Sequence, residues 1–372
     1  MGIFNQVFPE SLYLVVKIDD IFLLTTTGAK IQHGVNGARS FTCSFAGKEA
    51  LEHCRLGAKV EVNFGRGIPD KNIFNDDKTF IGIIKNINPG NTVSTFTALD
   101  YTTFLAESQY VKFDAQDYIG EDLYFAAARA CDYKGIDVSR LTRGSGIFIT
   151  KNMDLFGWKT RKEFIDACFN EMKVLVNDDR HPVNTIKQWQ YAIRDGTVMD
   201  FFLPDPDYTL AYPAVTLSEQ NKNIVDESVV SQIDTTRIIN AITVVSKDDE
   251  TIFAQLEDFG SQAKYGVIGN FLSHPSSDKN ELENVAYSVL NNFKEPTVSY
   301  VVTLANHDHL DLGDLIEFDL PSLPKDDIKT IVNYEISFED TIKTTYQVGQ
   351  SKVTFQEFIE DRKSVCREEC RS

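Results

Sequence analysis

Two short segments near the C-terminal end carry the residues with the clearest capacity for chemistry. The segment HDHLD holds His307, His309 and Asp311. Because alternate side chains of a β-strand share one face, these three could supply imidazole and carboxylate ligands to a metal ion. The alternative is a polar strand end that runs into a turn at Gly313, and we favour it. We therefore assign no metal ligand.

The second segment, CREEC, places Cys366 and Cys370 one helical turn apart. Two thiolates provide half of a zinc site, but no further Cys or His pair lies close in the sequence. We expect reduced cysteines on the buried stripe of a terminal helix. That stripe could dock on a neighbouring subunit or another protein. The other four cysteines are scattered and also favour reduced thiols (43, 54, 131 and 168).

No further motif points to catalysis or to a cofactor. The glycine-containing segments GRG and RGSG do not continue as a Walker or dinucleotide fingerprint, so both are interpreted as ordinary turns. Adjacent aspartates occur where turns are expected (76–77, 178–179 and 248–249). Trp158 and Trp189 are interpreted as residues of a core or a domain seam. We predict a protein that is not an enzyme and has no catalytic or cofactor-binding residues.

Composition limits the remaining classes of function. The chain has 372 residues and a formal net charge of −18, with no basic run, which argues against sequence-reading DNA binding. An acidic wall would still suit a passage through which nucleic acid slides, because it repels phosphate. The first residues, MGIFNQVFPE, contain no basic leader and no long apolar segment. We expect a protein made in a cytoplasm, without a membrane anchor.

The elements that must position these residues fall into four segments. Residues 1–105 read as short strands separated by turn clusters, typical of an antiparallel β-barrel or sandwich. Residues 106–205 read as an α+β insert, and residues 206–350 as a second β domain that contains a helix at 278–293. Residues 351–372 read as a C-terminal helix. Part of 206–240 could belong to either β domain.

The two β segments contain the same local sequence twice. Leu56-Gly57 precedes the strand KVEVNF, and Leu312-Gly313, followed by Asp314, precedes LIEFDL. In both places a polar loop, a long strand and a closing strand follow (TFIGIIKNIN with VSTFTALDY, and TIVNYEISF with KTTYQVGQ). This order predicts a duplicated β domain in which these residues shape the fold and bind no ligand.

The order of these motifs resembles the hub proteins at the centre of bacteriophage tail baseplates. The relevant family comprises the late-control-D-like hubs and the hub part of type VI secretion spikes. NGARSFTCSF is similar to its opening strand pair, and FIGIIKNINPGNTVSTFTALDYTTFLAES to its hairpin that leads into the insert. WKTRKEFIDACFNEMKVLVNDD is similar to the helix and strand of the insert, and AKYGVIGNF followed by LDLGDLIEF to the second β domain.

The resemblance implies an α+β, mainly β fold with two antiparallel β-barrel domains like the subunit of a tail tube. Three copies would then present six similar domains, so that a homotrimer forms a pseudo-sixfold ring. Such a symmetry adaptor joins the hexameric tail tube to a trimeric spike and leaves a channel for DNA during genome ejection. The expected partners are further copies of the chain, the spike, the tube or tube-initiator protein, the tape measure protein and inner baseplate proteins. The expected location is the virion, after assembly in the host bacterial cytoplasm.

The identity of the spike and the class of function both leave alternatives open. Secretion-type spike proteins continue into a long β-helix, whereas this chain ends after one helix, so we expect the spike to be a separate polypeptide. A tail-associated cell-wall hydrolase, with carboxylates in the insert, is the second interpretation. A host-surface-binding tail-tip protein is the third. The sequence does not distinguish a contractile from a flexible tail and does not identify the host.

Overall fold

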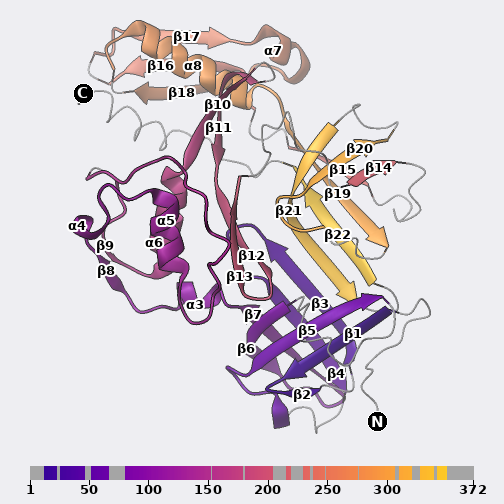
Figure 1. Ribbon diagram of the computed structural model, residues 1–372. Helices are drawn as coiled ribbons and strands as arrows, with labels where there is room; N and C mark the ends of the chain where they lie inside the picture. Colours follow the sequence, from indigo (N-terminus) through magenta and orange to yellow (C-terminus); the bar gives the residue numbers. More distant parts are fainter. Residues whose placement is uncertain are drawn as a thin grey trace. The chain divides into compact units, whose positions relative to one another are not determined.

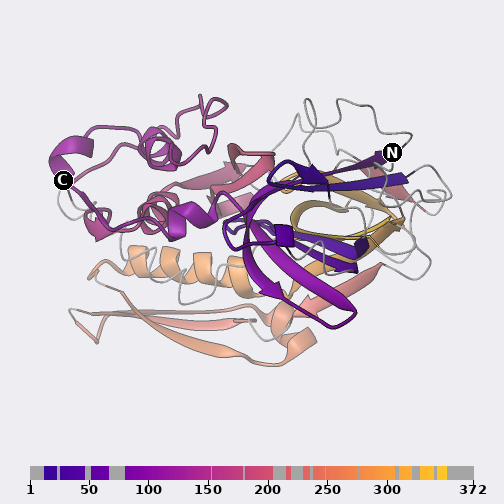
Figure 2. The same ribbon diagram turned by 90° about the horizontal axis from the view of Figure 1, so that it is seen from below.

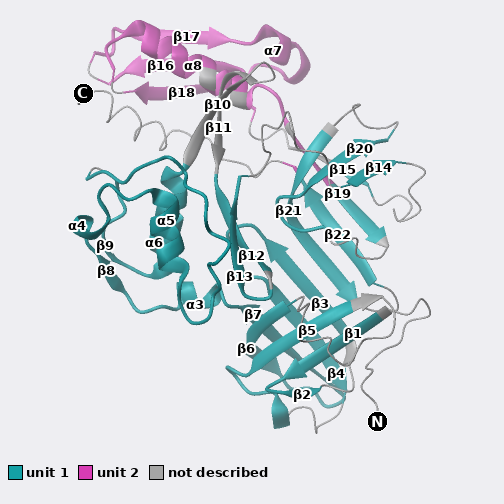
Figure 3. Ribbon diagram, in the orientation of Figure 1, with its two compact units in different colours: residues 1–173, 188–230, 301–348 teal, residues 174–187, 231–300, 349–372 magenta. Residues whose placement is uncertain are grey.

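The computed structural model describes most of the chain, in fourteen stretches (residues 12–22, 26–46, 52–66, 80–151, 153–178, 181–203, 215–218, 229–234, 238–247, 249–274, 276–305, 310–320, 327–338 and 342–349). The chain divides into two compact units (Figure 3). Unit 1 comprises residues 1–173, 188–230 and 301–348, and unit 2 comprises residues 174–187, 231–300 and 349–372.

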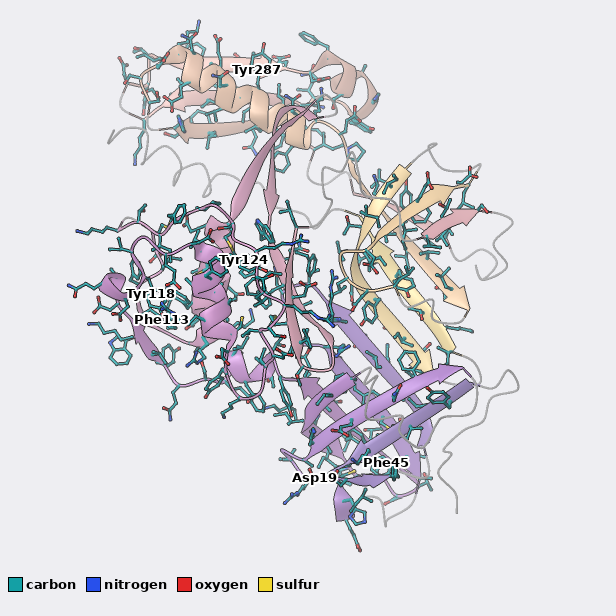
Figure 4. The ribbon with its side chains drawn as sticks, viewed as in Figure 1. Asp19, Phe45, Phe113, Tyr118, Tyr124 and Tyr287 are labelled. Atoms are coloured by element: carbon teal, nitrogen blue, oxygen red, sulfur yellow. The ribbon has the colours of Figure 1, made fainter. Side chains whose placement is uncertain are left out.

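The first strand group lies in unit 1 and is antiparallel throughout (Figure 1). Its strands are β1 (Leu12–Ile18), β2 (Ile21–Phe22), β3 (Thr26–Gly34), β4 (Ser40–Ala46), β5 (Lys59–Arg66), β6 (Phe80–Asn88) and β7 (Val93–Asp100). Burial alternates along β4, as expected of a strand with one face in a core. The Phe41 ring lies 5.6 Å from that of Phe80 and 5.9 Å from that of Phe96, and Phe45 (Figure 4) lies 6.0 Å from Phe96. Aromatic packing of this kind fixes which face of each strand is buried.

The α+β insert follows β7. Its first half contains α3 (Thr103–Ala106), β8 (Val111–Phe113), α4 (Ala115–Tyr118), α5 (Leu123–Cys131), β9 (Gly157–Lys159) and α6 (Arg161–Glu171). Two hairpins follow, β10 (Lys173–Asp178) with β11 (His181–Gln188) and β12 (Gln190–Asp195) with β13 (Val198–Phe202). Thr160 and Glu163 form a complete capping box at the start of α6. The helix α5 ends at Cys131, and its last backbone N–H bond is donated by Asp132 to the Ala128 carbonyl.

The insert has a core of its own, built by α5, α6 and the β12–β13 hairpin. Phe113 stacks on Phe164 with ring centroids 3.9 Å apart, and the Tyr118 ring lies 5.2 Å from Phe164 (Figure 4). The Arg129 guanidinium covers the outer side of Tyr118, 4.1 Å from the ring. Trp189 is partly buried against the same core. Trp158 is 69% exposed, so the prediction that it is a core or seam residue is wrong. It lies on β9 opposite Lys112, on the solvent side of a two-stranded ribbon.

The second strand group comprises β14 (Val215–Ser218), β15 (Val230–Asp234), β19 (Thr297–Ala305), β20 (Leu315–Asp319), β21 (Asp327–Phe338) and β22 (Ile342–Val348). These strands join those of the first group in one sheet of 13 strands. The predicted class, α+β and mainly β, is confirmed. Among the described strands the pairing follows an open path, and no closed barrel is found.

Unit 2 contains a compact α/β body with its own core. Its elements are β16 (Ala241–Ser246), β17 (Phe253–Glu257), α7 (Phe259–Tyr265), β18 (Gly269–His274) and α8 (Lys279–Phe293). Figure 2 shows α8 along one face of the three-stranded sheet β17-β16-β18. Asp278 caps this helix, which the sequence predicts at 278–293, while Tyr287 on its outer side is exposed (Figure 4). No pattern in the sequence separates this body from the strands on either side of it in the chain.

Candidate functional site: a repeated strand group and its junction

The two strand groups have the same order in space and along the chain. In the first group the neighbouring strands run β3-β4-β7-β6-β5, and in the second they run β15-β19-β22-β21-β20. If the five strands of each group are numbered in chain order, their order across the sheet is first, second, fifth, fourth, third in both groups. The groups differ in the strand that flanks the third strand: β1 pairs antiparallel with β5, whereas β14 pairs parallel with β20. Five strands with one order and one connectivity therefore occur twice.

The turn before the third strand of each group is the same in detail. Gly57 and Gly313 both have φ +83°, a left-handed conformation that favours glycine. The Gly57 N–H donates to the Ile84 carbonyl (2.8 Å), and the Ile84 N–H donates to Ala58 (2.9 Å). The Gly313 N–H donates to the Ile331 carbonyl (2.9 Å), and the Ile331 N–H donates to Asp314 (2.9 Å). The local likeness between Leu56-Gly57 and Leu312-Gly313 thus reflects one hydrogen-bonded turn built twice.

The strand registers extend this correspondence. Lys59 pairs with Ile83 at the start of the β5–β6 ladder, and Leu315 pairs with Thr330 at the start of the β20–β21 ladder. The next residue of each long strand, Ile84 or Ile331, is followed by a shift of register. A β-bulge inserts one residue and bends its strand, so its repetition at one position indicates a shared backbone path. By this register β6 corresponds to β21, and Ile87 corresponds to Tyr334.

The groups are joined by the antiparallel pair β3–β21 (Figure 1). Six residue pairs form this junction, from Asn333 opposite Gly34 to Phe338 opposite Ala29. On the exposed face Lys30 Nζ lies 2.8 Å from a Glu335 carboxylate oxygen, and Gln32 donates to the same oxygen at 2.9 Å. An exposed pair of this kind contributes little stability, on the order of 0.5 kcal/mol, but it favours one register.

A buried polar cluster lies at the end of the junction. Arg39 is 2% exposed; its guanidinium lies 5.4 Å from the Phe80 ring centroid and donates to the Arg194 carbonyl at 3.2 Å. The Arg39 N–H donates to Asp100, a buried carboxylate that also accepts from the Thr102 N–H. Burial raises the pKa of Asp100, and the Arg39 charge opposes that rise. The Arg39 charge thus offsets part of the cost of burying the Asp100 carboxylate.

His33 and Tyr334 complete this cluster from the two paired strands. His33 Nδ1 lies 3.2 Å from the Tyr334 hydroxyl and 3.8 Å from an Asp311 carboxylate oxygen. Burial lowers the pKa of His33 well below its ordinary value, and the charges of Arg39 and Arg194 lower it further. Burial raises the pKa of Asp311 to about 6, although the same arginines oppose the rise. The junction therefore holds a neutral imidazole at neutral pH.

The two equivalent turns differ in what covers them. Arg194 donates to the Leu312 carbonyl, and its guanidinium lies 4.6 Å from the Phe202 ring centroid. Leu312 is 0% exposed, whereas Leu56 is 67% exposed. A Cβ added at Gly313 would approach Arg194 and Phe202 to 2.7 Å, but one added at Gly57 would meet nothing within 4 Å. The insert hairpin β12–β13 therefore covers the second turn and leaves the first open.

The candidate chemical residues are distributed as follows. His307, His309, Cys366 and Cys370 lie outside the described residues. Asp311 is described, and its carboxylate accepts from the Leu312 N–H within the turn (2.7 Å). Within the described stretches no group of three or more His, Cys, Asp or Glu side chains could hold a metal ion.

The RGSG segment lies in a loop, whereas Gly65 and Arg66 of GRG belong to strand β5, so the interpretation of GRG as a turn is wrong there. In RGSG the backbone N–H groups at Ser145 and Gly146 donate to the carboxylate of Asp122, at 3.0 and 2.8 Å. These donors are therefore already used inside the protein. Cys43, Cys54, Cys131 and Cys168 are buried and free, and burial raises the pKa of Cys54 to about 11. None of the described helices is long and apolar enough to cross a membrane.

Comparison with known proteins places this fold. No protein-family model and no curated protein matches the chain. Among solved structures, the chain is similar to the tail protein from Neisseria meningitidis MC58 (TM-score 0.60, 12% identity, covering 91% of this chain and 97% of that one). It is also similar to the 43 kDa tail protein of prophage MuSo2 from Shewanella oneidensis (TM-score 0.56, 14% identity, 91% and 98%). A chain of the half-lidded Francisella PdpA–VgrG complex is similar too (TM-score 0.52, 10% identity, 94% and 60%).

At these identities the likeness concerns the fold. The chain has the fold of phage tail proteins, and it shares that fold with a chain of a VgrG complex. The resemblance to tail and baseplate hub proteins, predicted from the sequence, is confirmed at this level.

Proposed function

We propose that this chain is the structural hub of a phage tail baseplate and works as a homotrimer. Three copies supply six strand groups of one kind, which can form a pseudo-sixfold ring between a hexameric tail tube and a trimeric spike. The observation that carries the proposal is the repeated strand order within one continuous sheet, together with the fold of phage tail proteins. Head-to-tail interfaces that close a ring would cover the sheet edges that an isolated chain leaves unpaired.

The proposed role requires no catalysis. The partners in this proposal are the spike, the tube or its initiator protein, the tape measure protein and inner baseplate proteins. The location is the virion, after assembly in the host cytoplasm. The ring encloses a channel for DNA during genome ejection. A trimer carries a formal charge of −54, three times that of the chain, and acidic side chains on the channel wall would keep the phosphate backbone from binding.

The purified full-length chain tests this proposal. Native mass spectrometry should detect a species of about 126 kDa, three times the 42.0 kDa chain. Negative-stain images should contain rings with an open centre and threefold symmetry. A chain that stays monomeric up to roughly 100 µM would contradict the homotrimer. Release of soluble fragments from purified peptidoglycan would instead support the hydrolase interpretation.

A further inference from the structure

The repeated strand groups define where one copy of the chain can meet the next. Inside the chain, β3, the first strand of one group, pairs with β21, the fourth strand of the other. If the two groups exchanged roles, the corresponding pair would join β15, the first strand of the second group, to β6, the fourth strand of the first group. This pair does not occur among the described strands: β15 ends the path of their sheet, and β6 pairs there with β5 and β7 alone.

The free edge of β6 begins where its pairing with β5 stops. The Ile84 N–H and carbonyl face the turn at 57–58, and the bulge follows. Because the backbone groups of an antiparallel strand face alternate sides, those of Asn86 and Asn88 face β7 and those of Ile87 face outward. Asn86 and Asn88 are exposed and Ile87 is half-buried. One N–H and one carbonyl at Ile87 therefore face away from β7, on the side where the pairing with β5 has ended.

The corresponding edge of β21 is the one that β3 occupies. Tyr334, which corresponds to Ile87, pairs with His33, and the Val35 N–H donates to the Val332 carbonyl at the bulge (3.3 Å). In this junction the end of β3 lies beside the turn at 311–314, where His33 approaches Asp311. A strand placed in the same way against β6 would lie beside the first turn and reach the exposed side chain of Leu56.

We propose that β15 of one copy pairs antiparallel with β6 of the next copy at Ile87, and that this pair buries Leu56. The inference rests on the proposed homotrimer and identifies the surface that closes it. Strand addition to an open edge supplies main-chain hydrogen bonds, and a repeated head-to-tail contact closes a ring. The partner strand is β6 and not the terminal strand β2, because in the chain's own junction β21 lies inside its group, between β20 and β22.

A proline at the open edge tests the pair. Ile87→Pro removes the outward N–H while the β6–β7 ladder, whose nearest donors are Asn86 and Asn88, remains. Ile87→Ala is the matched control, because it shortens the same side chain and keeps the N–H. The proline variant should need a concentration roughly tenfold or more higher for half-assembly than the alanine variant, as measured by analytical ultracentrifugation. Equal assembly of two variants with unchanged circular dichroism would overturn the inference.

Disulfide cross-linking provides a second test that does not depend on the proline variant folding. Ile87→Cys is combined with a cysteine at each position of 230–234 in turn, in a chain whose Cys366 and Cys370 are replaced by serine. At least one combination should give disulfide-linked dimers and trimers on a non-reducing gel. Ile21→Cys on β2 replaces Ile87→Cys in the control series and should give none. Cross-links from β2 only, or from neither strand in an assembled trimer, would refute the β15–β6 pair.

The two proposals fail in different ways. If the unmodified chain does not form a trimer, the hub function fails and the interface is refuted with it. If the chain forms a trimer, but Ile87→Pro does not weaken assembly and no cysteine pair at β6 cross-links, the hub proposal stands and this interface is wrong.

Discussion

Alanine substitutions at the two equivalent glycines test whether the insert packs tightly on the second turn, because only one of the two turns is covered. Gly57 and Gly313 share the same φ of +83°, so alanine suffers the same backbone strain at both. Only Gly313 lies beneath side chains, since an added Cβ would come within 2.7 Å of Arg194 and Phe202. Gly57→Ala is therefore an internal control for Gly313→Ala.

The expected losses follow from these contacts. A non-glycine residue in the left-handed region costs roughly 1–2 kcal/mol, part of which is offset because alanine restricts the unfolded chain. We expect Gly57→Ala to lower the free energy of unfolding by about 1 kcal/mol. At Gly313 the methyl group must also displace Arg194 or Phe202, and overpacking of this kind costs about 1–3 kcal/mol. We expect a loss of about 2–4 kcal/mol there.

Urea unfolding followed by tryptophan fluorescence can separate these values. The chain has two tryptophans, Trp158 and Trp189, and both belong to unit 1, so the fluorescence transition reports on the unit that contains both turns. The free energies come from the midpoint and slope of that transition. Equal losses in the two variants would refute the conclusion that the hairpin β12–β13 packs tightly on the second turn.

Four further predictions concern the junction and the insert. Arg39→Met should lower the free energy of unfolding by about 1.5–3 kcal/mol, because it removes the guanidinium that donates to the Arg194 carbonyl and whose charge offsets the burial of the Asp100 carboxylate. His33 has a lowered pKa, so the unfolded chain binds the proton first and stability should fall as the pH drops below about 6.5; His33→Gln should remove this fall in urea unfolding at a series of pH values. Asp311, with its pKa raised to about 6, acts in the opposite direction, so Asp311→Asn should remove a gain in stability between pH 7 and pH 4. Thr160→Ala, which breaks the capping box of α6, should cost about 1 kcal/mol by thermal unfolding, and an unchanged transition would show that the cap is dispensable.

Several features of the fold could be predicted because their causes are local. A left-handed glycine between a leucine and an alternating strand specifies a turn within a few residues, and this signal appears at both Gly57 and Gly313. The capping box of Thr160 and Glu163 likewise depends on residues three positions apart. The order of such local signals in two parts of the chain predicted the repeated strand group.

Other features depend on residues far apart in the sequence, and no local pattern contains them. His33 and Tyr334 meet across about 300 positions because β3 pairs with β21, and that pair makes one sheet of two strand groups. No local pattern singles out His33 or Arg39.

The sequence by itself determined the two turns, the strands that follow them and the helix starts. Backbone conformation and helix capping depend on residues only a few positions apart. Only the tertiary structure decided that Leu312 is buried while Leu56 is exposed, and that Trp158 faces solvent. Burial depends on which distant segment covers a residue, and two identical turns acquire different surroundings when one hairpin packs on only one of them. For the same reason, no local pattern marks the strand edge at Ile87. Its role follows from the pairing of the corresponding residue of β21, Tyr334, with His33 of β3.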